Sequence, residues 1–281
     1  MEPNYRKHLF SLLKKYSGLS NAKIESYLDE SSMKLWEEAI THSSFDPHHN
    51  YDLLELYGDT KLNEFASEYI RFVHPRVINI QWLDKIRHYL KSRDVFMKFT
   101  IVLDLARFLK IGADSDIRRI LSDTSGKEQK RYEKLMGDIS EAWFQALFIV
   151  SRSKSAGVGV AYQVCYNVAM KLFEATVGNI PLDPEIYFDA KTMFKELVEK
   201  YPFNWIEKGQ INSIRKTRKN EDGSITVSFF DKEGNMVGTA TEVNEHKAEQ
   251  SAAKNALEVL REKGAIVSVP DPYERTIKPI R

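Results

Sequence analysis

Two short acidic stretches, far apart in the chain, lie within segments that are otherwise apolar, at residues 50–59 and 134–142. The acids concerned are Asp52, Glu55 and Asp59 in the first stretch and Asp138 and Glu141 in the second. At about 100° per residue, the spacing within each stretch keeps its carboxylates on one face of a helix. Like charges in a partly dry cleft repel one another and lose solvation, and a hard divalent cation relieves that cost. Since Mg²⁺ is the usual ion where phosphate is also present, the sequence predicts a metal site for phosphodiester chemistry.

The composition limits the remaining possibilities. With 281 residues and a 42% hydrophobic fraction, the chain can form one large domain and one small domain with well-packed cores. The formal net charge is only +1, so any nucleic-acid binding has to come from a local patch. The single cysteine, Cys165, excludes an internal disulfide and is expected to be buried. No apolar run could span a bilayer and no signal peptide is recognisable, so we expect an intracellular protein, cytoplasmic or nuclear, with no membrane partner.

Helical periodicity dominates residues 1–177, where apolar side chains recur at three- and four-residue spacings, for example at Leu83, Ile86 and Leu90. A linker at 178–186 contains two prolines, which disfavour continuation of a helix. Beyond it, a helix, three period-two segments with hairpin-like turns and a last helix predict a small α-β-β-β-α module. We place this module at 187–265, and the proline-containing tail at 266–281 is expected to be extended or disordered.

The acidic stretches and their surroundings resemble the ribonuclease III family. Residues 52–59 (Asp-Leu-Leu-Glu-Leu-Tyr-Gly-Asp) resemble its signature helix, and residues 137–142 (Gly-Asp-Ile-Ser-Glu-Ala) resemble its second acidic motif. Residues 39–44 (Ala-Ile-Thr-His-Ser-Ser) and 83–87 (Leu-Asp-Lys-Ile-Arg) are similar to the segments before and between these motifs. The terminal module looks like a double-stranded-RNA-binding domain. The resemblance therefore implies an all-α nuclease domain followed by a small α+β RNA-binding domain.

The resemblance also implies roles for particular acids. It makes Glu55, Asp59, Asp138 and Glu141 catalytic and metal-binding, with Glu141 most directly tied to a second ion. Asp52, where the family usually has glutamate, is a fifth catalytic candidate. Two Mg²⁺ ions roughly 3.5–4 Å apart, with Mn²⁺ able to substitute, would activate a water and stabilise the leaving 3′ oxygen. We expect no small-molecule cofactor.

The family works as a homodimer with one cleft for each strand of double-stranded RNA. This geometry implies staggered cuts that leave 5′-phosphate and 3′-hydroxyl ends with short 3′ overhangs, in RNA processing or degradation. Some of the apolar residues on the signature helix are therefore expected to form a dimer contact rather than core: Leu53, Leu54, Leu56 and Tyr57. Gly58 costs about 1 kcal/mol relative to alanine inside a helix, which a close backbone approach would explain.

In the terminal module, the resemblance places Thr192, Lys195 and Glu196 against the minor groove of the RNA duplex. Further candidates for RNA contacts lie on the first strand and the last helix: Arg215, Lys216, Arg218, His246, Lys247 and Lys254. The last helix opens with Asn-Glu-His-Lys at 244–247, where the family usually has consecutive basic residues. Weak RNA binding by the module alone is the expected consequence.

Three alternatives stay open. The chain could be a catalytically silent family member that binds RNA in a ribosomal or processing complex, although such proteins generally lose the metal carboxylates. It could be a heterodimer partner that supplies one active half-site, or a protein that sequesters duplex RNA without metal. His42, within the motif at 39–44, is expected to cap or pack rather than to bind metal.

Overall fold

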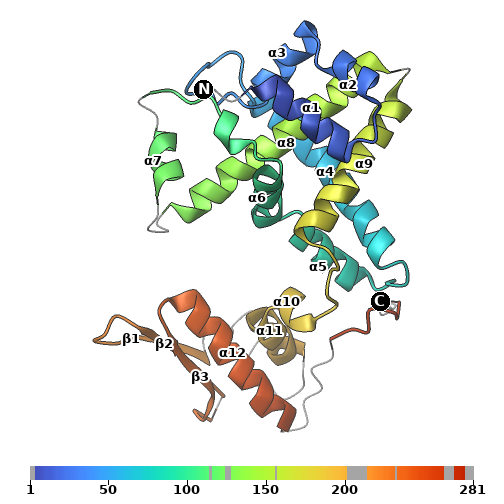
Figure 1. Ribbon diagram of the computed structural model, residues 1–281. Coiled ribbons are helices and arrows are strands. Elements are labelled where there is room, and N and C mark those ends of the chain that lie inside the picture. The colour runs from blue at the N-terminus through green and yellow to red at the C-terminus, as the bar shows by residue number, and fades with distance from the viewer. Residues whose placement is uncertain are drawn as a thin grey trace. The chain divides into compact units, whose positions relative to one another are not determined.

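The computed structural model describes residues 4–113, 116–123, 128–155, 157–200, 214–231, 233–262 and 269–275. The chain divides into two compact units (Figure 1). The first comprises Met1–Val77 and Ile86–Pro181, and the second comprises Ile78–Lys85 and Leu182–Arg281. The predicted fold class, an all-α domain followed by a small α-β-β-β-α module, is confirmed.

The first unit is built from helices, and its described residues include only one isolated β-bridge, between Thr41 and Lys110. Its helices are α1 (Tyr5–Tyr16), α2 (Asn21–Tyr27), α3 (Glu30–Glu38), α4 (Asp52–Val73), α6 (Arg93–Val102), the 3₁₀ helix η1 (Ala106–Phe108), α7 (Asp116–Ser122), α8 (Gln129–Lys154) and α9 (Val158–Thr176). Helix α5 (Ile80–Leu90) has residues in both units. Several helix starts are fixed by side chains that accept a hydrogen bond from a first-turn N–H: Asn4, Ser20, Asp29 and Ser92.

Helix α8 is the centre of the first unit and contacts α3, α4, α6 and α9. Its middle is buried on every side, with Trp143 and Phe144 both 1% exposed or less, as expected for a helix that is apolar all round. Phe148, near its end, is half-buried under the ammonium group of Lys61, which lies 3.8 Å from the ring centroid. Cys165 on α9 is a buried free thiol, as predicted.

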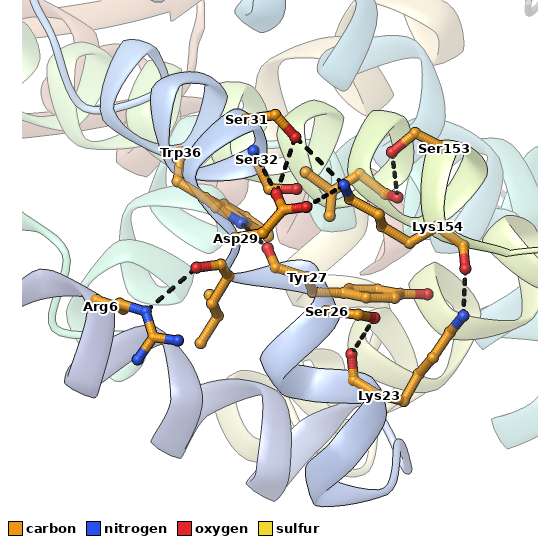
Figure 2. A network of polar contacts seen from close by, with 12 residues as sticks. Arg6, Lys23, Ser26, Tyr27, Asp29, Ser31, Ser32, Trp36, Ser153 and Lys154 are labelled. Atoms are coloured by element: carbon orange, nitrogen blue, oxygen red, sulfur yellow. Dashed lines mark hydrogen bonds and ion pairs between the residues drawn. The ribbon is translucent and has the colours of Figure 1, made fainter.

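A polar network joins the N-terminal helices to the end of α8 (Figure 2). Lys154 forms an ion pair with Asp29, the N-cap residue of α3, and Lys23 donates to the carbonyl oxygen of Lys154. Trp36 donates from Nε1 to the carbonyl oxygen of Tyr27 at 3.0 Å. Hydrogen bonds from Lys154 and from the first turn of α3 hold the pKa of Asp29 below its ordinary value. The network therefore fixes where the junction of α2 and α3 meets α8.

Helices α4 and α8 touch through their backbones at Gly58. A Cβ atom at this position would lie 1.9 Å from the carbonyl oxygen of Glu141 and 2.5 Å from its carbonyl carbon. No side chain other than hydrogen fits there, so the close approach inferred from the sequence is present. This crossing places the acid-bearing face of α4 directly beside that of α8.

The second unit contains the terminal module. Its elements are α10 (Pro184–Tyr187), α11 (Ala190–Lys200), β1 (Arg215–Lys219), β2 (Ile225–Phe230), β3 (Met236–Glu242) and α12 (Glu245–Glu262). The strands form an antiparallel sheet in the order β1-β2-β3. Phe194 of α11, Val227 and Phe229 of β2 and the alanine stripe of α12 form its core on one face of the sheet.

Part of the predicted tail, Val269–Arg275, forms neither helix nor strand, turns at Pro272 and Tyr273, and has fixed partners within the second unit. The carbonyl oxygen of Pro272 accepts hydrogen bonds from the backbone N–H groups of Ile78 and Asn79, both at 3.1 Å. Trp82 donates from Nε1 to the carbonyl oxygen of Pro270 at 2.6 Å. The start of α5, which the sequence assigns to the helical domain, therefore packs with the terminal module.

Within the described residues, no helix has the length and apolar character needed to cross a membrane.

We expect Gly58→Ala to lower the free energy of unfolding, although alanine gains about 1 kcal/mol in helix propensity. The added methyl group meets backbone atoms that cannot rotate away, and overpacking of this kind costs about 1–3 kcal/mol or more. Urea unfolding followed by circular dichroism measures the difference.

Gly137→Ala is the matched control, since Gly137 lies inside α8 and a Cβ there has its nearest neighbour, Phe96 Cβ, at an ordinary 3.7 Å. This variant should be as stable as the wild type or slightly more stable. Equal gains in stability for the two variants would contradict the tight crossing at Gly58.

Candidate functional site

Three carboxylates from α4 and α8 converge beside the crossing at Gly58. One oxygen each of Glu55, Asp138 and Glu141 lies within 4.8 Å of the others. Glu141 is 9% exposed, and Glu55 and Asp138 are half-buried. Helical spacing keeps Asp138 and Glu141 on one face of α8, and the backbone contact at Gly58 brings Glu55 of α4 to meet them. We call these three residues the carboxylate cluster.

The two other predicted acids lie at its edges. Asp59, half-buried on α4, is close enough to Glu141 for its charge to raise the pKa of that carboxyl, but it is not one of the three mutually close acids. Its Oδ1 accepts a hydrogen bond from Asn63 Nδ2 at 3.0 Å. Asp52 is exposed at the first turn of α4, and its charge acts on Glu55 and Asp138. The structure thus gathers three of the five predicted acids tightly and holds two nearby.

The cluster is electrostatically unfavourable for its ionised forms. Burial, together with the charges of Asp59, Asp138 and Glu55, raises the pKa of Glu141 to about 9. Burial also raises the pKa of Asp138 and of Glu55. Each shift has the same physical cause, because a carboxylate removed from water and set beside other carboxylates resists losing its proton.

Lys134 is a member of the site that the motif comparison did not assign. Its Nζ lies 2.5 Å from Asp138 Oδ2, four residues further along α8, and its charge also acts on Glu55 and Glu141. The positive charges of Lys134 and of Arg93, the exposed first residue of α6, partly oppose the rise in the pKa of Asp138 that burial causes. The four-residue spacing of Lys134 and Asp138 was visible in the sequence, but the position of Arg93 depends on how α6 packs against α8.

His42 packs and caps rather than joining the cluster. Its Nδ1 accepts a hydrogen bond from the backbone N–H of Ser44 at 3.0 Å, and its ring meets that of Tyr51 edge-on at 5.6 Å between centroids. Burial lowers the pKa of His42, against the opposing charges of Asp52 and Asp138. The arrangement agrees with the role expected from the sequence.

The carboxylate cluster fits a hard divalent cation. Its donors are all carboxylate oxygens, the ligand type that Mg²⁺ and Mn²⁺ prefer in proteins. One ammonium group, that of Lys134, faces acids that are partly or fully buried. A cation held by Glu55, Asp138 and Glu141 would remove the repulsion that raises their pKa values, and Asp59 lies beside Glu141 as a further oxygen donor.

Arg215, the first predicted RNA contact on β1, has two glutamates of α12 as its ion-pair partners. Arg215 forms an ion pair with Glu245, and its Nε lies 3.5 Å from Glu249 Oε1. Glu249, 6% exposed, is also paired with Lys191 at 2.8 Å. Arg215 and Lys191 are therefore held in internal ion pairs at the opening of α12.

The other predicted RNA contacts lie on the surface of the module. Thr192 is exposed in the first turn of α11 and donates from its backbone N–H to Asp189 Oδ1 at 2.8 Å. The remaining candidates are exposed on α11, β1 and α12: Lys195, Glu196, Lys216, Arg218, His246, Lys247 and Lys254. Lys254 borders a pocket that Asp189 and Met193 also line. These residues are spread over three elements of the module.

Comparison with known proteins identifies sequence relatives of the chain. No family model matches the chain. Ribonuclease 3 of Aquifex aeolicus is 25% identical over 228 residues, which cover 81% of this chain and 90% of that protein. Ribonuclease 3 of Aliarcobacter butzleri is 26% identical over 245 residues, covering 86% of this chain and 98% of that protein. Among solved structures, the nuclease domain of ribonuclease III from Campylobacter jejuni is similar to this chain, with 19% sequence identity and a TM-score of 0.43. The match covers 62% of this chain and 97% of that structure's chain.

The two sequence relatives align with most of the chain, and the acidic motifs that suggested the resemblance lie at its candidate site. Both relatives support the resemblance to the ribonuclease III family that the sequence predicts. The enzyme class expected from the sequence, a ribonuclease III-type endoribonuclease, is supported by the same relatives.

Glu141 should make the stability of the metal-free protein depend on pH. An acid whose pKa is raised on folding contributes stability at low pH, and this contribution is lost as pH rises from about 4.5, its value in the unfolded chain, towards about 9. We therefore expect Glu141→Gln to be more stable than the wild type at pH 8 in chelator, by about 1–3 kcal/mol, and the gap to close at pH 5.

Thermal unfolding at both pH values measures this gap, and Glu64→Gln, at an exposed position on α4, is the control. Addition of Mg²⁺ at pH 8 should stabilise the wild type more than Glu141→Gln, because binding to the folded state shifts unfolding by mass action. A variant that is less stable than the wild type at pH 8 in chelator would show that Glu141 is not an uncompensated acid.

Proposed function

We propose that this chain is a Mg²⁺-dependent endoribonuclease that hydrolyses double-stranded RNA as a homodimer. The cuts leave 5′-phosphate and 3′-hydroxyl ends with short 3′ overhangs, in RNA processing or degradation. The observation that carries the proposal is the convergence of Glu55, Asp138 and Glu141 within 4.8 Å, in a chain that is 25% and 26% identical to two ribonuclease 3 sequences.

Four acids would hold the ions: Glu55, Asp138 and Glu141 of the carboxylate cluster, with Asp59 beside Glu141. When bound, two divalent ions supply Lewis-acid chemistry that activates a water and stabilises the leaving 3′ oxygen. The side chains around the acids orient them, since Asn63 donates to Asp59 and Lys134 pairs with Asp138. Asp52 is exposed at the start of α4, so its carboxylate would contact solvent or RNA rather than an ion inside the cluster. Mn²⁺, which accepts the same oxygen ligands, is expected to substitute for Mg²⁺.

The apolar residues of α4 divide into a core set and an exposed set. Leu54 is 6% exposed and packs in the core, whereas Leu53, Leu56 and Tyr57 are each more than half exposed. These three flank Glu55 in the sequence, so a large apolar surface borders the candidate site. A surface of this kind supports the contact of a second copy of the chain, which would pair two carboxylate clusters for the two strands of a duplex.

A catalytically silent RNA-binding subunit is the alternative function. Such a protein has no use for three mutually close acids, two of them half-buried and one 9% exposed, which destabilise one another without a cation. The retention of this costly cluster favours the enzyme, and the same retention argues against a protein that only sequesters duplex RNA.

Purified protein should cleave a long RNA duplex in Mg²⁺ or Mn²⁺, and chelator should abolish the reaction. Glu141→Gln is expected to lower the rate at least 100-fold, because it removes a charged ligand of the proposed ions. Glu64→Gln serves as the control and should retain the wild-type rate. End-group analysis of the products checks the 5′-phosphate and the 3′-hydroxyl. A wild-type rate for Glu141→Gln would exclude the proposed metal ligands.

Light scattering tests the homodimer. The wild type should have the mass of two chains at micromolar concentration, and Leu56→Lys should shift the equilibrium towards monomer by placing a charge in an apolar contact. Phe72→Lys, at another exposed apolar position on α4, is the matched control and should leave the mass unchanged. A wild type that is monomeric throughout would leave the two-cleft arrangement without support.

A further inference from the structure

Tyr51 begins the helix that bears the first acids and is fixed in place by its backbone. It directly precedes α4, with φ −77° and ψ −9°, which are helical values. Its carbonyl oxygen accepts a hydrogen bond from the N–H of Glu55 at 2.8 Å, and its own N–H donates to the carbonyl oxygen of Thr41 at 3.0 Å. The four-residue spacing directs the side chains of Tyr51 and Glu55 to the same side of the helix. The phenol of Tyr51 is therefore directed to the edge of the carboxylate cluster.

The hydroxyl group of Tyr51 is a neutral donor that has no partner in the fold. The residue is only 4% exposed, and burial raises the pKa of its hydroxyl above the ordinary value. The charges of Asp138 and Asp52 act in the same direction, so the O–H keeps its proton. Among the described residues nothing accepts a hydrogen bond from this O–H, and its oxygen is not sealed from solvent. A ligand that approaches the acids can therefore meet it.

His42 presents a second neutral donor beside the first. Its ring meets that of Tyr51 edge-on, with 5.6 Å between the centroids. The backbone N–H of Ser44 donates to Nδ1, and because a backbone N–H can only donate, Nδ1 has no proton. Burial lowers the pKa of His42, so the ring is neutral and its one proton is on Nε2. This N–H also has no partner among the described residues, and the charges of Asp52 and Asp138 act on the ring.

Neutral donors suit an acidic site that has to receive a phosphate. A cation placed beside these carboxylates pairs with them, as Lys134 does with Asp138 at 2.5 Å. An O–H or N–H without charge forms no such ion pair and stays available to a ligand. Phosphate oxygens accept hydrogen bonds from groups of this kind, and a charged acceptor strengthens the bond.

We infer that the O–H of Tyr51 and the Nε2–H of His42 donate hydrogen bonds to a non-bridging oxygen of the RNA phosphate that reaches the carboxylate cluster. The inference rests on the proposed function, because it takes RNA as the ligand of the site. The pair holds the phosphate from the side of the cluster where α4 begins. Cap and contact then share one ring, since Nδ1 of His42 binds the chain and Nε2 binds the substrate.

Tyr51→Phe tests the hydroxyl, because it retains the buried ring and removes only the O–H. We expect kcat/KM for cleavage of an RNA duplex in Mg²⁺ to fall roughly tenfold, since a hydrogen bond to a charged group is lost. Tyr16→Phe is the matched control: Tyr16 lies on α1, is also 4% exposed, and should give kcat/KM within about twofold of the wild type. Thermal unfolding at pH 8 supplies a second measurement, in which Mg²⁺ should stabilise Tyr51→Phe as much as the wild type.

His42→Asn tests the imidazole. The side-chain oxygen of asparagine can accept the N–H of the residue two positions on, so the contact with Ser44 is kept while the Nε2–H is lost. The same roughly tenfold fall in kcat/KM is expected, measured at a temperature where thermal unfolding shows the variant to be folded.

A wild-type kcat/KM for Tyr51→Phe would overturn the inference and leave the proposed function intact, because cleavage by the carboxylate cluster would continue. Loss of Mg²⁺ stabilisation in Tyr51→Phe, to the extent expected for Glu141→Gln, would also overturn it, since the hydroxyl would then act on the metal-binding acids. A wild type that cleaves no duplex RNA in Mg²⁺ or Mn²⁺ would remove the proposed function itself, and the inference with it.

Discussion

The contact between the backbones of α4 and α8 at Gly58 is the constraint on which the site depends. Because Gly58 has no side chain, the backbone of α4 can approach the carbonyl group of Glu141 closely; a Cβ atom on residue 58 would lie 1.9 Å from that carbonyl oxygen. Glu55 and Asp59 stand on either side of Gly58 along α4, so the same contact brings both towards Glu141. Any larger residue would separate the helices and move the carboxylates apart. A packing requirement on one small residue therefore decides whether the acids form a single site.

The cluster is unfavourable by itself, and the rest of the first unit stabilises it. Helix α8 is held by apolar contacts along its middle and by the network of Lys154 and Asp29 near its end. Against this framework the repulsion among Glu55, Asp138 and Glu141 cannot be relieved by moving the helices apart. Repulsion that the fold maintains is relieved instead by protons, by Lys134 or by a bound cation.

The sequence predicted those parts of the site that follow from local geometry. Spacings of three and four residues place Asp138 and Glu141 on one helix face however the helix is packed. For the apolar residues of the signature helix, the sequence predicted that some are not core, but it did not say that Leu54 is the buried one. Glu55, and not Asp59, is the α4 acid that lies close to both Asp138 and Glu141. This difference depends on where α4 crosses α8, which periodicity does not determine. The role of Arg215 could not be predicted either, because its partners Glu245 and Glu249 lie on another element. The start of α5 is a similar case, since an apolar stripe shows that a helix is buried but not which core buries it.

The two units use the same electrostatic rule in opposite ways. In the carboxylate cluster, acids stand next to acids, and the site is left with a demand for positive charge. At the opening of α12, acids stand next to Arg215 and Lys191, and the demand is met within the module. Glu245 in the first turn is additionally favoured by the partial positive charge at a helix N-terminus, so this arrangement stabilises the fold. The cost is that two cations beside this helix end, Arg215 and Lys191, are occupied by the chain's own carboxylates.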